Sequence, residues 1–207
     1  MGQSAKFWDR IAKRYSKQSI ADEATYQKKL EITREYFRPD MEVLEFGCGT
    51  GSTALLHAPY VKHILATDIS SRMIEIAQGK ADTQNVENIT FECAAIDTFS
   101  LPDQIMDAVL GLNILHLVEN RDEIIAKIHK ILKPGGVFVT STVCIADMMK
   151  IFRIVVPVGG FLRLIPLVKV FTTKDLEASL INAGFVIDFQ WQPGKNKAVF
   201  IVAKKAT

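Results

Sequence analysis

The sequence has only three cysteines among its 207 residues and no long hydrophobic run free of charge. Cys48, Cys93 and Cys144 are far apart and odd in number, which argues against a disulfide framework or a metal site and predicts buried, reduced thiols. The most apolar uncharged stretches, residues 108–118 and 154–162, are too short to cross a bilayer, and the first residues lack the apolar core of a signal peptide. We therefore expect a cytoplasmic protein with no metal and no transmembrane segment.

A strong excess of either charge is also missing. The formal net charge is +2 at pH 7, and no block rich in lysine and arginine occurs beyond Lys204 and Lys205, so no nucleic-acid partner is expected. We expect a small-molecule partner instead. With 48% hydrophobic residues, the chain is long enough to bury one sizeable core and shows no sign of a second. This predicts a single domain over residues 1–207, whose oligomeric state the sequence leaves open.

What the sequence does have is a glycine-rich motif at residues 43–51. An apolar strand pattern, interrupted by Glu45, runs into Gly47, Gly49 and Gly51, which allow positive φ and let the main chain approach a ligand closely. A carboxylate at the end of a buried strand repels phosphate but can accept hydrogen bonds from an ammonium group or from the main chain of its own loop. The G-x-G-x-G spacing also differs from the G-x-G-x-x-G of nicotinamide and flavin sites. A tight turn without a ligand is the alternative.

Strand and helix patterns alternate through most of the chain. Expected strands cover residues 43–46, 63–67, 89–93, 106–112, 137–143, 185–191 and 198–203, and expected helices cover residues 4–17, 24–37, 52–58, a segment from Ser70, 121–132 and 172–183. Residues 133–136 are expected to form the turn that stops the helix before them. This alternation predicts an α/β protein with a doubly wound, seven-stranded, mostly parallel sheet, an antiparallel C-terminal strand and a ligand at the carboxyl edge.

One acidic residue follows the second expected strand, where such sheets bind a nucleoside. A carboxylate at the tip of this strand, here Asp68, can accept hydrogen bonds from both ribose hydroxyls of an adenosine. An acidic residue in an exposed loop is the alternative interpretation. The position favours a role for Asp68 in binding.

Two further segments flank this expected core. Residues 1–38 are expected to form a helical lid, in which Trp8 and Tyr15 either cover a cofactor or only pack in the core. Residues 145–171 are rich in apolar side chains and broken by proline and glycine, so we expect an apolar cap insertion beside the carboxyl edge. The cap either roofs the core or forms an acceptor pocket, and its candidate substrate contacts are Phe152, Arg153, Phe161 and Arg163.

These motifs occur in the order typical of one enzyme family. The chain resembles the class I S-adenosylmethionine-dependent methyltransferases, in the branch with the ubiquinone and menaquinone biosynthesis enzymes, through residues 7–15, 45–51, 68, 96–97, 113–117, 132–136 and the closing pair of strands. The resemblance implies a Rossmann-like fold, S-adenosyl-L-methionine as methyl donor and S-adenosyl-L-homocysteine as product. It implies methyl transfer to a small acceptor. The expected cap favours an apolar or amphipathic acceptor and leaves peripheral membrane contact open.

The same resemblance implies roles for individual residues. Glu45, Gly47 and Gly49 would hold the methionine end of the cofactor. The other implied cofactor contacts are Tyr15 at the carboxylate, Cys48 and Gly51 in the loop, Asp68 at the ribose, Ile69 against the adenine, Ile96 through its main-chain amide and Asn113 beside the sulfonium. Ala95 stands where the family commonly has an aspartate that accepts from the adenine amine, so either Asp97 or the main chain takes that role.

Methyl transfer depends chiefly on aligning two reactants and excluding water, so a dedicated base is optional. His116 is the candidate catalytic group near the methyl, with burial in the core as the alternative. Two other functions fit the same fold. One is an NAD(P)-dependent oxidoreductase, which would want its third glycine where Ser52 stands, and the other is a protein that binds S-adenosylmethionine without turnover.

Overall fold

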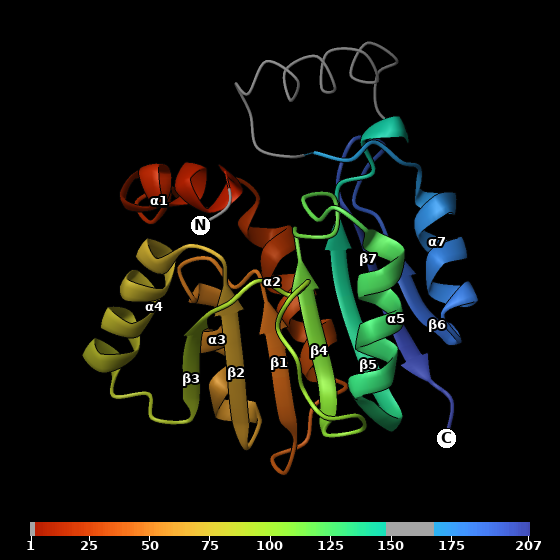
Figure 1. Ribbon diagram of the computed structural model, residues 1–207, viewed down its shortest axis with the longest axis horizontal. Coiled ribbons are helices and arrows are strands. Elements are labelled where there is room, and N and C mark those ends of the chain that lie inside the picture. The colour runs from red at the N-terminus through yellow and green to blue at the C-terminus, as the bar shows by residue number, and fades with distance from the viewer. Residues whose placement is uncertain (1–2, 148–167) are drawn as a thin grey trace.

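The computed structural model describes residues 3–147 and 168–207, and its central feature is a seven-stranded sheet with helices on both faces (Figure 1). The strands lie in the order β3-β2-β1-β4-β5-β7-β6. They are β1 Glu42–Phe46, β2 His63–Asp68, β3 Ile89–Cys93, β4 Met106–Leu112, β5 Leu132–Thr142, β6 Phe185–Trp191 and β7 Val199–Lys205. Neighbouring strands are parallel except where β7 pairs with β5 and β6. The predicted fold class is confirmed.

The helices are α1 Gln3–Tyr15, α2 Glu23–Arg34, α3 Ser52–His57, the 3-10 turn η1 Ala58–Tyr60, α4 Ser71–Gln84, α5 Arg121–Ile131, the 3-10 turn η2 Ile145–Asp147 and α7 Thr173–Asn182. Capping side chains mark the start of α2, α4, α5 and α7. Asp22, Ser70 and Asn120 each accept a hydrogen bond from a backbone N–H in the first turn of the helix that follows. Thr172 and Asp175 form a reciprocal capping box at α7. Helices α2 and α3 cover one face of the sheet, and α5 and α7 cover the other (Figure 1).

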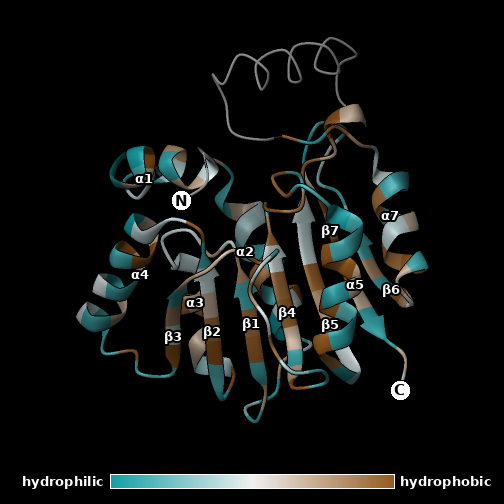
Figure 2. Cartoon of the chain, viewed as in Figure 1, coloured by the Kyte–Doolittle hydropathy of each residue, from teal (hydrophilic) through white to brown (hydrophobic). Residues whose placement is uncertain are grey.

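Successive side chains of β1 point to opposite faces of the sheet and therefore pack against different helices. Leu44 and Phe46 pack in the cluster beneath α5 and α7, where Phe46 stacks on Phe138 at a ring-centroid distance of 6.3 Å. Val43 packs in the opposite cluster, beneath α2 and α3. Because successive side chains of a strand point to opposite faces, Glu45 points to the α2 and α3 face. Hydrophobic residues follow the strands of both clusters in Figure 2, which makes a carboxylate at this position unusual.

The start of β5 differs from the prediction. Residues 133–136 were expected to be a turn, but β5 begins at Leu132, directly after α5, and runs through them. Leu132 pairs with Met106 and Val137 pairs with Ala108, so the glycine-containing stretch forms a bulge in the strand. The last carbonyls of α5 accept hydrogen bonds from the segment before β4, which draws the chain straight into the sheet.

The prediction of three buried thiols is wrong for one of them. Cys48 and Cys144 are buried, but Cys93 is exposed. Cys93 ends β3, which pairs only with β2 and forms an edge of the sheet. Its side chain therefore has no neighbouring strand on one side. The local apolar sequence did not reveal that this strand lies at the edge.

The helix α1 lies across the carboxyl ends of the strands, beside the start of α4 (Figure 1). The Oδ1 atom of Asp9 accepts hydrogen bonds from the Ser70 hydroxyl at 2.6 Å and from the Arg72 N–H at 3.2 Å. Both donors lie at the N-terminus of α4, where a negative charge is favourable. These contacts fasten α1 to the edge at which a ligand was predicted.

Most of the expected cap, residues 148–167, lies outside the described residues. The candidate substrate contacts there are Phe152, Arg153, Phe161 and Arg163. The described ends of the cap meet, because the Ala146 N–H donates to the Phe171 carbonyl at 3.1 Å. Within residues 3–147 and 168–207, no helix is long and apolar enough to cross a membrane.

Candidate functional site

A cavity of about 1110 Å³ lies at the carboxyl edge of the sheet, between α1, α2 and the loops that follow β1, β2, β3 and β4. Its walls contain most of the residues singled out in the sequence. These are Tyr15, Glu45, Gly47, Cys48, Gly49, Asp68, Ile69, Ala95, Ile96, Asp97 and Asn113. Trp8 also lines it, so two of the three aromatic residues of α1, Trp8 and Tyr15, border this cavity. The chain thus brings together residues from widely separated segments.

Two predicted site residues do not line the cavity. Gly51 has φ +72°, and a Cβ there would lie 2.7 Å from the Ala77 Cβ, so this glycine allows close packing rather than ligand contact. Among the described residues, His116 is not part of the cavity walls, and burial lowers the pKa of its imidazole to about 4. The predicted catalytic role of His116 and the predicted ligand contact of Gly51 therefore gain no support from the geometry of the cavity.

The first two glycines of the loop, Gly47 and Gly49, have different surroundings. Gly47 has φ +67°, and a Cβ there would meet the Ile114 Cγ1 at 2.7 Å, so a side chain is excluded by packing. Gly49 has φ +55°, and its Cβ would meet only the Tyr15 ring, at 3.9 Å. The main chain at Gly49 is therefore open toward the cavity, as a close approach by a ligand requires.

Asp68 ties the glycine loop to the tip of β2. Its Oδ2 accepts from the Gly49 N–H and its Oδ1 from the Ser70 N–H, each at 2.9 Å. Burial raises the pKa of Asp68, although these two donors favour the charged form. Each carboxylate oxygen has a second lone pair, so Asp68 can hold the loop and still accept hydrogen bonds from ligand hydroxyls.

Glu45 is the most unusual group in the cavity wall. Its residue is 3% exposed, and Oε2 has no hydrogen-bond partner among the described residues. Burial, with a smaller effect of the Asp68 charge, raises the pKa of Glu45 to about 8. A cationic ligand group would stabilise the ionised form that the protein alone disfavours.

The loop after β3 is held by a residue that the sequence analysis missed. The Lys127 ammonium, on α5, donates to the carbonyl oxygens of Ile96 at 2.7 Å, of Asp97 at 3.3 Å and of Phe99. These bonds fix the loop so that Ile96, which is 6% exposed, borders the cavity. One signal was present in the sequence, because Lys127 falls on the inward stripe that begins at Ile124.

The wall opposite the glycine loop also holds a lysine that no motif marked. The Lys29 Nζ, from α2, donates to the Ser141 Oγ at the end of β5, at 2.8 Å. Burial lowers the pKa of Lys29. Both residues line the cavity. In the described parts of the chain, no group of three or more His, Cys, Asp and Glu residues could hold a metal ion.

The tyrosine of the lid is close to the loop and to Asp68. The rings of Trp8 and Tyr15 meet edge to face with centroids 6.4 Å apart. Burial, followed by the nearby Asp68 charge, raises the pKa of the Tyr15 phenol, which therefore stays a hydrogen-bond donor at neutral pH. The lid thus adds an aromatic wall and one polar group to the cavity.

Sequence comparisons point to one kind of domain. Residues 43–136 match a family model described as a methyltransferase domain. The uncharacterized methyltransferase YcgJ of Bacillus subtilis is 29% identical over 101 residues, or 49% of this chain and 40% of that protein. A demethylmenaquinone methyltransferase of Symbiobacterium thermophilum is 26% identical over 141 residues, or 65% and 56%. A malonyl-acyl-carrier-protein O-methyltransferase of Bacillus cereus is 32% identical over 128 residues, or 58% and 46%. The chain spans about half the length of these curated relatives.

Solved structures share the fold over most of the chain. The crystal structure of YcgJ from Bacillus subtilis has a TM-score of 0.74 and 16% identity, and the match covers 87% of this chain and 99% of that one. An S-adenosylmethionine-dependent methyltransferase from Mesorhizobium loti has a TM-score of 0.71 and 19% identity, over 86% and 96%. The cyclase SpnF also has a TM-score of 0.71, with 16% identity, over 87% and 80%. At these identities the likeness establishes the fold, and the chemistry has to be argued from the site.

Proposed function

We propose that this member of the class I S-adenosylmethionine-dependent methyltransferases binds S-adenosylmethionine and transfers its methyl group to a small acceptor. The observation that carries the proposal is Glu45, a buried carboxylate in the cavity wall whose Oε2 is unpaired among the described residues. A buried carboxylate is unfavourable alone and favourable beside a cation. The α-ammonium of the cofactor is a cation of the right size.

The neighbouring groups fit the rest of the cofactor. The open main chain at Gly49 allows close approach of the methionine end, beneath the Tyr15 ring. Asp68 keeps free lone pairs for the ribose hydroxyls. Ile69 and Ile96 supply apolar walls for the adenine. Ala95, Asp97, Cys48 and Asn113 complete this half of the cavity.

The bound cofactor supplies an electrophilic methyl group on a sulfonium. Held by Glu45, Gly49 and Asp68, the cofactor would give this methyl group to an acceptor nucleophile and keep the electrons of the broken bond on sulfur, while the acceptor would release its proton to solvent. The residues of the chain align the two reactants and exclude water, which α1 assists by covering the edge of the sheet. No histidine of the cavity wall is required for this reaction.

We infer that the acceptor is a small molecule with an apolar part, because partly exposed apolar side chains such as Leu112 and Leu117 line the cavity. A cytoplasmic location is part of the proposal. The free state of all three cysteines supports it, because thiols persist in reducing compartments.

Ligand binding tests the cofactor part of the proposal. S-adenosylhomocysteine at a hundred times its dissociation constant should raise the melting temperature by about 5 to 10 °C, since such saturation stabilises by about 2.7 kcal/mol. NAD at the same concentration should give no shift. A shift with NAD alone would instead favour the oxidoreductase interpretation.

A matched pair of glycine variants tests the place of binding. Gly49→Val should abolish the shift with S-adenosylhomocysteine, because it adds a branched side chain where φ is +55° and the loop must meet the ligand. Gly79→Val is the control, because a Cβ at Gly79 meets nothing within 4 Å. Equal shifts in the two variants would move the site away from the loop.

Turnover separates an enzyme from a binding protein. Labelled S-adenosylmethionine incubated with a panel of small acceptors should transfer label to at least one of them. Binding of S-adenosylhomocysteine without any transfer across the panel would favour the non-catalytic alternative.

A further inference from the structure

The wall of the cavity opposite Asp68 is built from α2, β5 and β7. Glu45 pairs in register with Leu110, Leu112 pairs with Ser141, and Ser141 pairs with Phe200. Paired residues point to the same face of a sheet, as do residues two apart on one strand. The side chains of Glu45, Leu112, Ser141 and Phe200 therefore point to the same face. This places a second group of side chains beside the cofactor half.

The charged member of this wall is Lys29. Its ammonium donates to the Ser141 hydroxyl at 2.8 Å and forms no ion pair among the described residues. The Asp22 carboxylate acts on it from beyond ion-pair distance and is itself paired with Lys197 at 3.4 Å. The sequence of residues 148–167 contains no aspartate or glutamate that could pair with Lys29. A half-buried ammonium bonded only to a neutral hydroxyl is poorly compensated. An anion in the cavity would compensate it.

The carboxylate of the cofactor is not that anion. Ser141 lies on β5, two strands from Glu45 on β1, and two strand spacings amount to about 10 Å. The ammonium and carboxylate of an amino acid share one carbon atom, so a cofactor whose ammonium meets Glu45 keeps its carboxylate near Glu45 as well. The lysine is placed for a second molecule beside the cofactor.

The surroundings of Lys29 suit an amphipathic anion. A second lysine, Lys197, also lines the cavity, and its ion-pair partner among the described residues is Asp22, at 3.4 Å. The partly exposed side chain of Leu112 provides apolar surface in the same cavity, above the fully buried Phe200 ring. Together these residues offer positive charge at one end and an apolar face at the other.

We propose that the wall formed by Lys29, Leu112 and Ser141 binds the methyl acceptor, and that this acceptor carries a carboxylate or phosphate that pairs with Lys29. The inference rests on the proposed methyl transfer and names the class of its second substrate. The buried hydroxyl of Ser141 positions the ammonium, and the apolar body of the acceptor packs on Leu112. Lys29 thus selects acidic over uncharged acceptors.

Two fluorescent probes with the same ring system test this site directly. 1-Anilinonaphthalene-8-sulfonate is an apolar anion, and N-phenyl-1-naphthylamine lacks its charge. In protein saturated with S-adenosylhomocysteine, Lys29→Met should weaken binding of the anionic probe at least about tenfold, on the scale of a charged hydrogen bond, and leave the neutral probe unchanged. Lys28→Met is the matched control, because Lys28 is exposed and its ammonium lies over the Trp191 ring, outside the cavity.

The outcomes distinguish this proposal from the proposed function. If Lys29→Met leaves the anionic probe unaffected, or weakens S-adenosylhomocysteine instead, the acceptor site is overturned while the cofactor site stands. A second outcome is that the wild type does not bind S-adenosylhomocysteine, while Lys29→Met still weakens the anionic probe and not the neutral one. The proposed methyl transfer is then overturned, and an anion site at Lys29 remains. Lys29→Gln gives the same comparison should the methionine variant not fold. Displacement of the anionic probe by decanoate or by decyl phosphate, and not by decanol, then tells which anion is preferred.

Discussion

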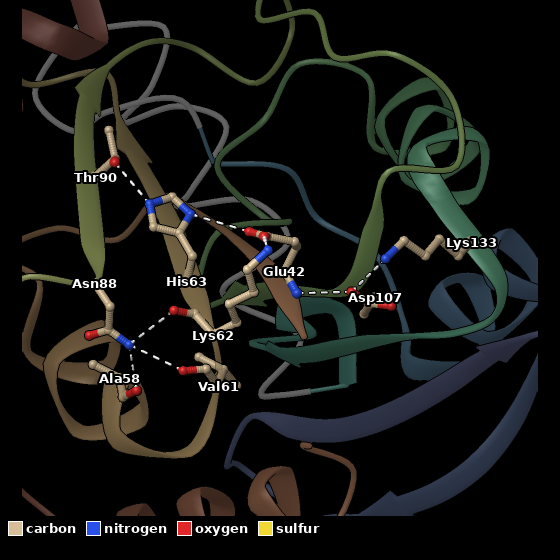
Figure 3. Close-up of polar contacts among 9 residues, drawn as sticks. All are labelled: Glu42, Ala58, Val61, Lys62, His63, Asn88, Thr90, Asp107 and Lys133. Atoms are coloured by element: carbon tan, nitrogen blue, oxygen red, sulfur yellow. Dashed lines mark hydrogen bonds and ion pairs between the residues drawn. The ribbon is translucent and has the colours of Figure 1, made fainter. Parts of the chain in front are cut away.

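Charged side chains at the two ends of the sheet differ in whether they have a partner of opposite charge. At the amino edge, the Glu42 carboxylate pairs with the Lys62 ammonium at 2.8 Å and with the His63 ring at 3.4 Å (Figure 3). At the carboxyl edge, one oxygen of Glu45, on the same strand, is unpaired among the described residues, and the hydrogen-bond partner of Lys29 in the same part of the chain is a hydroxyl. A compensated and an uncompensated carboxylate are thus three positions apart on one strand.

The rest of the amino edge follows the same rule. The Asp107 Oδ2 accepts from the Glu42 N–H and pairs with the Lys133 ammonium, each at 2.8 Å. The Asn88 amide donates to the carbonyls of Ala58 at 2.8 Å and Val61 at 3.1 Å (Figure 3). Such partners stabilise the fold, whereas unpaired groups are destabilising and persist where a ligand needs them. We therefore expect the amino edge to contribute to stability and the carboxyl edge to ligand binding.

Of the changes at the carboxyl edge, removal of the Asp68 side chain should weaken ligand binding most. Asp68→Ala removes the acceptor of the Gly49 N–H and of two ligand hydroxyls, so the affinity for S-adenosylhomocysteine should fall about a hundredfold, from charged hydrogen bonds of about 1.5 to 3 kcal/mol. Titration calorimetry measures this. Asp103→Ala, an exposed control, should bind normally. An unchanged dissociation constant in Asp68→Ala would remove this residue from the site.

Two isosteric variants on β1 sharpen the comparison. Glu45→Gln should weaken S-adenosylhomocysteine about tenfold or more, because the ammonium loses its countercharge. It should also raise the melting temperature of the free protein at pH 8.5, where the buried carboxylate is ionised. Glu42→Gln should do the reverse, with normal binding and a slightly lower melting temperature. Parallel effects in the two variants would contradict the assignment of the edges.

The pH dependence of binding should report the same carboxylate. The pKa of Glu45 is raised to about 8, so in the free protein it is mostly protonated at pH 6.5 and must lose its proton to meet an ammonium. The affinity for S-adenosylhomocysteine should therefore rise about tenfold from pH 6.5 to pH 8, and binding at pH 7 should release a proton. Calorimetry in buffers of different ionisation enthalpy detects that proton. A pH profile that is equally steep in Glu45→Gln would assign it to another group.

The smallest effect is expected from the amino edge, and on stability alone. The Asp107 side chain is 13% exposed and serves two donors, so Asp107→Ala should lower the free energy of unfolding by about 1 to 3 kcal/mol. This corresponds to a melting temperature lower by about 2 to 4 °C per kcal/mol. Binding of S-adenosylhomocysteine should not change. Lys133→Met should cost less, because Asp107 keeps its bond to the Glu42 N–H.

Much of the fold could be predicted because local patterns determine it. Alternating apolar strands and capped helices gave the parallel sheet, and the short connection before β7 gave the antiparallel pair. The cavity was placed correctly because parallel strands end at one edge, which brings the glycine loop and Asp68 together. The roles of these residues in binding stay predictions.

What the sequence did not reveal depends on contacts between distant segments. Lys29 and Ser141 are 112 residues apart, and neither belongs to a motif. The exposure of Cys93 depends on which strand lies at the edge of the sheet, and the burial of His116 depends on the segments that pack around it. The start of β5 depends on pairing with a segment before β4. These features follow from tertiary structure rather than from local propensity.

The hydrogen bonds of Ser70 join three parts of the molecule. Its hydroxyl donates to Asp9 on the lid and caps α4, while its N–H donates to Asp68. A movement of α1 away from the sheet should therefore pull on the residue that donates to Asp68, the carboxylate proposed to bind the ribose. In kinetic terms, we expect displacement of α1 and escape of the product of the proposed reaction to be one event. We expect the residence time of the product, rather than the transfer of the methyl group, to limit turnover.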